Sequence, residues 1–152
     1  MPTPPSSRFE IAKDGVSRIV VGYDGSGPSR DAVAFAAGIA RRDRAELVLV
    51  YVETPTALTG FADAAGVVVP PVGTGLTEPL EAEILCALHD VGLDTRFVTR
   101  AGDIAGGIES VADELRADAI VVGRSAARIH SVIGSVATRL VRIAQRPVVI
   151  VP

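Results

Sequence analysis

Short, continuous apolar runs constrain the fold of this chain more than any other feature of its sequence. RIVVGYD (18–24) and ELVLVYVE (46–53) are rich in β-branched and aliphatic residues and lack the polar alternation of a half-exposed strand. AIVVG (119–123) and PVVIV (147–151) are of the same kind. Such runs are typical of strands buried on both faces, as in a parallel sheet covered by helices.

Helical patterns separate these runs. Apolar residues recur three and four positions apart within 32–40, 80–91, 104–115 and 134–145. An alternating segment, DTRFVTR (94–100), predicts one more strand. The resulting order, β-α-β-loop-α-β-α-β-α-β, predicts an α/β fold with a doubly wound parallel sheet of five strands, three layers (α/β/α) and right-handed crossovers.

Length and composition favour one domain. We expect a single domain over residues 18–152, after a flexible leader at residues 1–17 that is rich in Pro and Ser. Residues 54–78 contain many prolines and glycines and are predicted to form a long irregular loop. At 48% hydrophobic residues, the domain can bury a substantial core without disulfides.

Composition also argues against several classes of protein. A formal net charge of −3 and 4% aromatic residues do not supply the basic face or the stacking surface of a nucleic-acid-binding protein. No apolar run is long enough to cross a membrane, and no apolar signal region opens the chain, so we expect a cytoplasmic protein. Cys86, the single cysteine, excludes an internal disulfide and is expected to be a core thiol, since it lies among apolar helix residues.

Two loops follow predicted strands at the edge where sheets of this type bind ligands. In DGSG (24–27) the carboxylate can accept hydrogen bonds from a ribose or an amine, and the glycines allow close approach to the backbone. Alternatively, Asp24 or Ser26 only caps the N–H groups of the following helix.

The second loop runs from Gly123 to Ser135. A Gly-Ser pair at a helix start offers an anion free N–H groups, a hydroxyl and the positive end of the helix dipole, and Arg124 and Arg128 can add charge. The alternative is an ordinary strand-to-helix loop with Ser131 or Ser135 as the cap. Neither a Walker loop nor a GxGxxG turn is present.

A catalytic constellation is not evident in the sequence. His89 and His130 have no evident nucleophile or metal partner and are expected at the surface. No triad, paired-carboxylate site or metal cluster is recognisable. We therefore expect a protein that is not an enzyme and has no metal site.

Three segments together resemble the universal stress protein family. RIVVGYDGSGPSRDAVAFAAGIA is similar to the family's opening strand and helix, and AGDIAGGIESVADELRADAIVVG to its Gly-Asp helix and fourth strand. GSVATRLVRIAQRPVVIVP is similar to its closing helix and strand. The resemblance covers nearly the whole chain after the leader. It implies a Rossmann-like fold of the adenine-nucleotide alpha-hydrolase type with strand order 3-2-1-4-5.

The resemblance also implies a ligand and an assembly. Members are usually homodimers, commonly paired through the last strand, here Pro147 to Val151, an apolar edge that needs cover. One branch of the family binds ATP and another does not. In the binding branch the position of Asp24 contacts the nucleoside, that of Val52 meets the adenine, and the phosphates lie on a glycine-containing loop. The residues thereby implied in nucleotide binding are Asp24, Gly25, Ser26, Val52, Gly123, Arg124, Gly134, Ser135 and Val136.

This chain departs from the family's loop pattern, G-x-x-G, nine residues, G-[S/T], in two ways. Ala126 replaces the second glycine, and seven residues rather than nine separate it from Gly134. Alanine at a position of positive φ costs about 1 kcal/mol, and its methyl group can crowd a phosphate. The helix end of the phosphate site is retained at Gly134 and Ser135, while the half that wraps the phosphates is altered.

Three functions are consistent with these features. We favour a dimeric stress-response protein that binds ATP, with or without Mg²⁺, or a related adenine nucleotide, and is at most a slow ATPase because no general base is evident. The alternative is a dimeric interaction or regulatory protein of the same fold that binds no nucleotide and uses another surface, such as residues 54–78. An adenylating enzyme ranks below both, because a pyrophosphate-binding signature is missing. The sequence identifies no protein partner.

Overall fold

The structure of the protein, a computed structural model, describes residues 15–54, 77–124 and 135–152. The expectations for the leader up to residue 14, for most of the irregular loop, and for His130 lie outside these residues. One expectation is corrected, because α3 begins inside the segment predicted to be irregular. In chain order the elements are β1 (Arg18–Gly22), α1 (Gly27–Asp43), β2 (Glu46–Glu53), α3 (Thr77–His89), β3 (Thr95–Ala101), α4 (Ile104–Glu114), β4 (Ala119–Gly123), α5 (Ser135–Ile143) and β5 (Val148–Val151).

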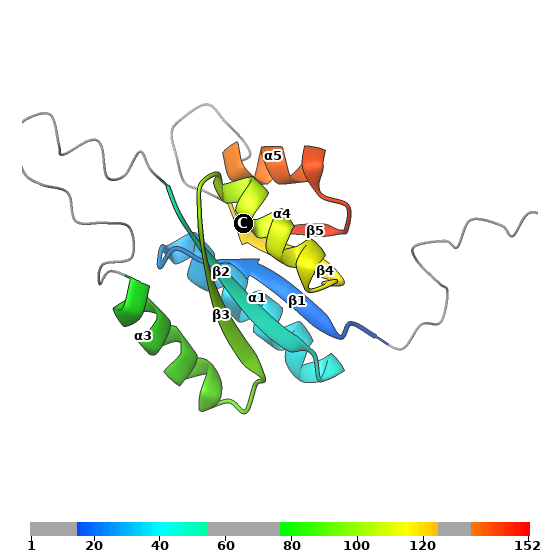
Figure 1. Cartoon of the computed structure of the whole chain (residues 1–152). Coiled ribbons are helices and arrows are strands. Elements are labelled where there is room, and N and C mark those ends of the chain that lie inside the picture. The colour runs from blue at the N-terminus through cyan, green and yellow to red at the C-terminus, as the bar shows by residue number, and fades with distance from the viewer. Residues whose placement is uncertain (1–14, 55–76, 125–134) are drawn as a thin grey trace, which may run out of the picture.

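The five strands form one sheet in the order β3-β2-β1-β4-β5, which confirms the predicted fold (Figure 1). All four pairings are parallel. The chain moves outward from β1 to β2 and β3 and then returns to β4 on the other side, so the strand order reverses at β1. Gly22 pairs with Val50, and Val21 with Val121, so the carboxyl ends of the three central strands meet at one edge.

Helices of the described residues cover both faces of the sheet (Figure 1). Val21 and Leu49 belong to the core on one face, where α1 and α3 pack, and Val20, Val48 and Ile120 belong to the core on the other face, where α4 and α5 pack. Successive side chains of a strand point to opposite faces. Because both faces are covered, the buried middle positions of the central strands, such as Ile19–Val21 and Leu47–Val50, are all apolar, which is why the sequence shows runs rather than alternation.

Side chains cap the first turns of two helices, one of them at Ser26, which the sequence suggests as a cap. Ser26 caps α1 by accepting a hydrogen bond from the Ser29 N–H at 3.3 Å, and Pro28 occupies the first turn. Asp103 caps α4 by accepting one from the Gly106 N–H at 2.7 Å. Both caps lie at the carboxyl edge of the sheet, so the same residues border the candidate site.

Helix α3 is the least buried of the helices in the described part of the chain. Leu80, Ile84 and Leu88 pack against the core, but only Leu88 is fully buried. Cys86 is exposed, which corrects the expectation of a core thiol, because its position falls off this apolar stripe. His89 is exposed, as predicted.

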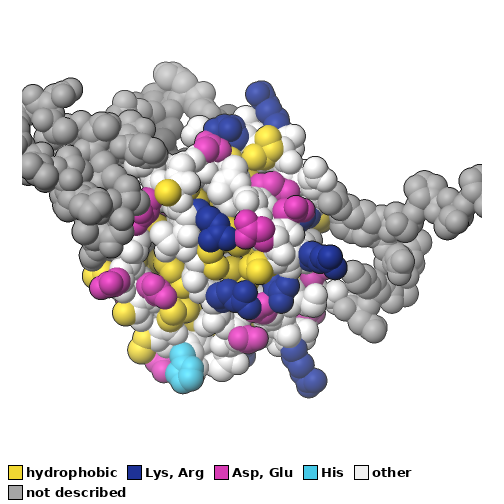
Figure 2. All heavy atoms as spheres, in the orientation of Figure 1, with side chains coloured by type: hydrophobic (Ala, Val, Ile, Leu, Met, Phe, Trp, Pro, Cys, Tyr) yellow, Lys and Arg dark blue, Asp and Glu magenta, His cyan; other side chains and the backbone are white. Residues whose placement is uncertain are grey.

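Charges of both signs are interspersed over the face shown in Figure 2. Several described charges join elements through ion pairs, such as Arg96 with Glu46 and Arg100 with Glu114. In residues 15–54, 77–124 and 135–152, no helix is long and apolar enough to cross a membrane.

Candidate functional site

A cavity of about 500 Å³ opens at the carboxyl edge of the sheet, where β1, β2 and β4 end. Its volume is in the range of small-molecule sites. Segments far apart in the sequence supply its walls: the β1–α1 loop, the end of β2, the start of α4, the end of β4 and the start of α5. The described residues that line it are Gly22, Tyr23, Asp24, Ser26, Pro28, Ser29, Val50, Val52, Ile104, Ile108, Val122, Gly123, Ser135 and Val136.

This cavity brings together most of the ligand residues that the sequence suggests. Gly25 and Arg124 are not among the residues that line it, and Gly134 lies outside the described residues. The Arg124 N–H donates to the Val151 carbonyl at 2.7 Å, so the backbone of Arg124 extends the pairing of β4 with β5. The six predicted residues that line the cavity are Asp24, Ser26, Val52, Gly123, Ser135 and Val136.

Asp24 lies exposed at the rim, just past β1, and its Oδ1 accepts a hydrogen bond from the Ser26 N–H at 2.9 Å. Burial alone would raise the pKa of this carboxyl, but hydrogen bonds from Ser26 and Ser29 outweigh burial and lower the pKa below its ordinary value. The carboxylate is therefore ionised at neutral pH and can accept further hydrogen bonds from a ligand. The capping alternative is confirmed for Ser26, whereas Asp24 organises the loop and also borders the cavity.

Gly25 links this loop to α3. Its φ is +81°, a conformation that favours glycine, and a Cβ there would lie 2.7 Å from Leu80 Cδ2. Arg30 donates from Nε to the Gly25 carbonyl at 3.2 Å and pairs with Glu83 of α3 at 3.0 Å. Gly25 therefore shapes the loop and lets α3 pack against it.

Gly123 ends β4 against the start of α1. A Cβ on Gly123 would lie 2.1 Å from the carbonyl oxygen of Pro28, a separation that real Cβ atoms essentially never show. Because the obstacle is backbone rather than a flexible side chain, packing requires glycine here whether or not a ligand binds. The sequence suggests only a phosphate-loop role for this glycine.

The cavity has an apolar floor that sequence reasoning did not assign to a site. Val50, Val52 and Val122 supply the strand side of this floor, and Ile104 and Ile108 of α4 supply the helix side. Ile104 remains 36% exposed, although its helical spacing predicts a core position. Its position in the first turn of a helix could have suggested that Ile104 borders a ligand site, because the helices of this fold begin at the edge of the sheet where ligands bind.

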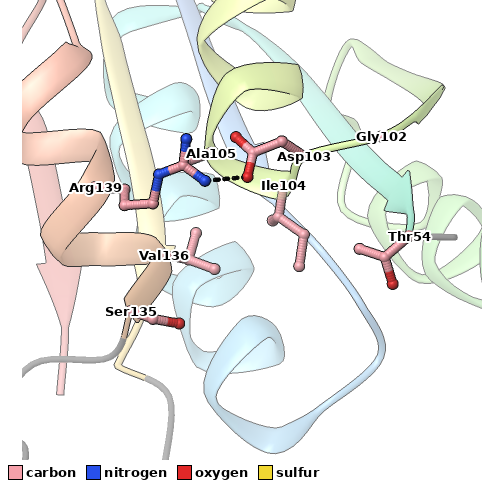
Figure 3. Close-up of a pocket in the computed structure, with 8 residues that line it drawn as sticks. All are labelled: Thr54, Gly102, Asp103, Ile104, Ala105, Ser135, Val136 and Arg139. Carbon is pink, nitrogen blue, oxygen red and sulfur yellow. Dashed lines mark hydrogen bonds and ion pairs between the residues drawn. The ribbon is translucent and has the colours of Figure 1, made fainter. Parts of the chain in front are cut away.

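A second pocket, of about 430 Å³, adjoins the first and shares Ile104, Ser135 and Val136 with it. Figure 3 shows Arg139 of α5 and Asp103 at the start of α4 reaching toward each other across this pocket, where they form an ion pair. Neither residue is among the ligand residues that the sequence suggests. Among the described residues, no group of three His, Cys, Asp or Glu residues is placed to hold a metal ion.

Residues 15–152 match the sequence model of the universal stress protein family. The chain belongs to this family. The match covers the cavity walls described above and extends through β5. A comparison with curated proteins finds no match.

Solved structures of universal stress proteins are similar to this chain over nearly its whole length. A universal stress protein in complex with cAMP is 24% identical, with a TM-score of 0.69, and the alignment covers 91% of this chain and 98% of that one. A family member from Burkholderia pseudomallei is 26% identical, with a TM-score of 0.59 and coverages of 90% and 96%. The universal stress protein of Archaeoglobus fulgidus in complex with dAMP is 22% identical, with a TM-score of 0.61 and coverages of 90% and 98%.

The resemblance noted in the sequence implies that residues 123–135 correspond to the family's glycine-containing loop. Ala126, Arg128 and Gly134 lie outside the described residues, so the sequence-based expectations for them stay predictions. Both described ends of the loop, Gly123 and Ser135, line the same cavity.

Proposed function

We propose that this universal stress protein binds an adenine nucleotide, with ATP as the favoured ligand, in the cavity at the carboxyl edge of its sheet. The observation that carries the proposal is the convergence described above. Six residues that the family pattern suggests come from separate segments of the chain and line one cavity of suitable volume.

The chemistry of the walls supports a nucleoside at the β1–β2 side. Val52 and Ile104 offer an apolar surface against which a base can pack, and Asp24 offers a carboxylate to the ribose hydroxyls. Because the Asp24 carboxylate is ionised, it repels phosphate groups. We therefore orient the ligand with its phosphates away from Asp24.

The start of α5 is the opposite wall and supports the phosphates. Ser135 is the first residue of this helix and brings a hydroxyl together with the N–H groups and the positive dipole end of a helix terminus. Two similar structures are described as complexes with cAMP and dAMP, which supports an adenine ligand in general.

We infer that the protein binds the nucleotide without rapid catalysis. Among the described cavity residues, Asp24 is the single carboxylate, and no histidine or cysteine lines the walls. The lowered pKa of Asp24 makes it a weak general base. Hydrolysis of bound ATP is therefore expected to be slow at most.

We also propose a homodimer through β5. This strand is at the edge of the sheet, and within the described part of the chain no strand pairs with its outer side. Pro147 and Val151 direct their carbonyls to β4, where they accept from the N–H groups of Ile120 and Arg124. By alternation, the backbone groups of Ile150 face outward, where a second copy can pair with them.

Calorimetry with adenosine, ATP and Mg-ATP tests the nucleotide proposal. Asp24→Asn keeps an acceptor for the Ser26 N–H but removes the negative charge. It should weaken adenosine binding about tenfold or more, which is the effect expected from the loss of one hydrogen bond to a charged group. Asp31→Asn, an exposed change on α1, is the matched control and should leave affinity unchanged. Absence of saturable binding to the wild-type protein at millimolar Mg-ATP would refute the proposal and favour the nucleotide-free interaction protein that Ala126 and the short loop suggest.

A further inference from the structure

The second pocket continues the nucleotide cavity along α5. Ser135, where we place the first phosphate, lines both cavities, together with Val136 and Ile104. A ligand group held at Ser135 therefore also borders the second pocket. Figure 3 shows Ser135 and Val136 near one end of this pocket and the Arg139–Asp103 pair near another.

The polar groups around the second pocket differ in how many hydrogen bonds they already make. Asp103 uses both oxygens, because Oδ2 accepts from the Gly106 N–H and Oδ1 accepts from Arg139. The Arg139 guanidinium uses Nη1 for this bond, while a guanidinium has five N–H donors in all. Both oxygens of Asp103 are already hydrogen-bonded, whereas N–H groups of Arg139 remain available, so the pocket offers donors to an anion.

Arg139 is also placed well for such a role. It lies one turn after Ser135 on α5, and residues four apart share a helix face. Its side chain is 56% exposed and that of Asp103 is 46% exposed, so their ion pair is weak and can adjust when a stronger partner arrives. Arginine binds phosphate through two parallel N–H···O bonds. We expect these bonds to be stronger than the exposed ion pair of Arg139 with Asp103.

We propose that Arg139 binds the distal phosphates of the nucleotide in the second pocket and thereby makes the protein prefer nucleoside di- and triphosphates to nucleosides and monophosphates. The proposal rests on the proposed function for the nucleoside end. In this proposal, a residue outside the glycine-containing loop binds the charged phosphates of the ligand. That loop is short in this chain and carries Ala126.

The test compares adenosine, AMP and ATP in calorimetry with the wild-type chain, Arg139→Gln and Arg142→Gln. Arg142 is exposed on the same helix and does not line the pocket, so its variant changes the net charge equally. Arg139→Gln should weaken ATP binding about tenfold, the effect of one charged hydrogen bond, and leave adenosine binding unchanged. Equal effects of the two variants on ATP, or no effect of Arg139→Gln, would overturn the proposal.

Inorganic tripolyphosphate separates this proposal from the nucleotide proposal. If the wild-type chain binds tripolyphosphate and Arg139→Gln weakens that binding while Arg142→Gln does not, the anion site stands even where adenosine fails to bind. If adenosine binds but Arg139→Gln leaves both ATP and tripolyphosphate unaffected, the nucleotide proposal stands and the role of Arg139 is wrong. If the wild-type chain binds neither ATP nor tripolyphosphate, both proposals fail.

Discussion

The carbonyl oxygen of Pro28 occupies the space that a side chain on Gly123 would need, only 2.1 Å from the position of its Cβ. The contact joins the last residue of β4 to the first turn of α1. It brings the two ligand loops together, because the first turn of α1 directly follows the loop that carries Asp24, and Gly123 opens the loop that leads to α5. The geometry of the cavity therefore depends on a backbone-to-backbone approach that only glycine permits.

Gly123→Ala is expected to lower the free energy of unfolding by about 1–3 kcal/mol, as overpacking at a rigid contact does. Chemical denaturation of the wild-type and variant chains measures this change. Gly27→Ala is the control, because a Cβ there meets nothing within 4 Å. Equal stabilities of the two variants would show that the contact with Pro28 relaxes easily.

Tyr23→Phe is expected to leave the free energy of unfolding unchanged or to raise it by up to about 1 kcal/mol, because an unpaired buried polar group is costly. The Tyr23 side chain is packed edge-on against Phe97, and the residue is 3% exposed. Among the described residues its hydroxyl has no hydrogen-bond partner of normal geometry. Thermal and chemical denaturation check the expectation, and a loss of more than 1 kcal/mol would reveal a partner for the hydroxyl.

The same variant tests a pH dependence. Burial raises the pKa of Tyr23 above its ordinary value of 10.0, and the nearby Arg30 only partly opposes this shift. A raised pKa means that the stability contributed by the neutral phenol is fully present below pH 10 and is lost as the pH rises through the folded-state pKa. Tyr23→Phe should therefore reduce the alkaline loss of stability. Identical alkaline profiles for the wild-type chain and Tyr23→Phe would contradict the expectation.

Ile150→Pro is expected to convert the proposed dimer to a monomer. Proline removes an N–H that faces the open edge of β5, and edge positions of this kind tolerate proline without loss of the sheet. Light scattering after size exclusion measures the mass, and far-UV circular dichroism checks the fold. Ile150→Ala keeps the N–H and serves as the control for the lost side chain. A wild-type chain that is monomeric, or a proline variant that stays dimeric with its fold intact, would rule out pairing through β5.

The order of elements was predictable because it depends on local pattern. Each buried strand needs a continuous apolar run, such as that around Val20 or Val48, and each covering helix needs an apolar stripe. Both patterns can be recognised in the sequence from the spacing of its apolar residues. The ends of elements were less predictable. β1 stops at Gly22 rather than at Asp24, because Tyr23 pairs only with the Val50 carbonyl and the chain then turns into the cap of α1. α5 is likewise described from Ser135 to Ile143, shorter at its carboxyl end than the predicted helix over 134–145.

The candidate site was only partly predictable, for reasons that lie in side-chain contacts. Asp24 and Ser135 could be suggested because glycine-rich loops after parallel strands are local signals of known position in the fold. Cys86 was misplaced because the apolar residues next to it suggested burial, whereas its position falls off the stripe of Leu80, Ile84 and Leu88. Arg139 gave no local signal, since its partner Asp103 is 36 residues away in the sequence.

The sequence by itself therefore determined the doubly wound sheet and the two loops at its carboxyl edge, since alternating buried runs and helical stripes permit few other topologies. Only the tertiary structure decided that Gly123 is held against Pro28, that α3 packs against Gly25, and that Arg139 meets Asp103 beside Ser135. These relationships depend on how closely separate elements approach in space. Distances of that kind are set by the packing of the whole core and are not encoded in any short segment.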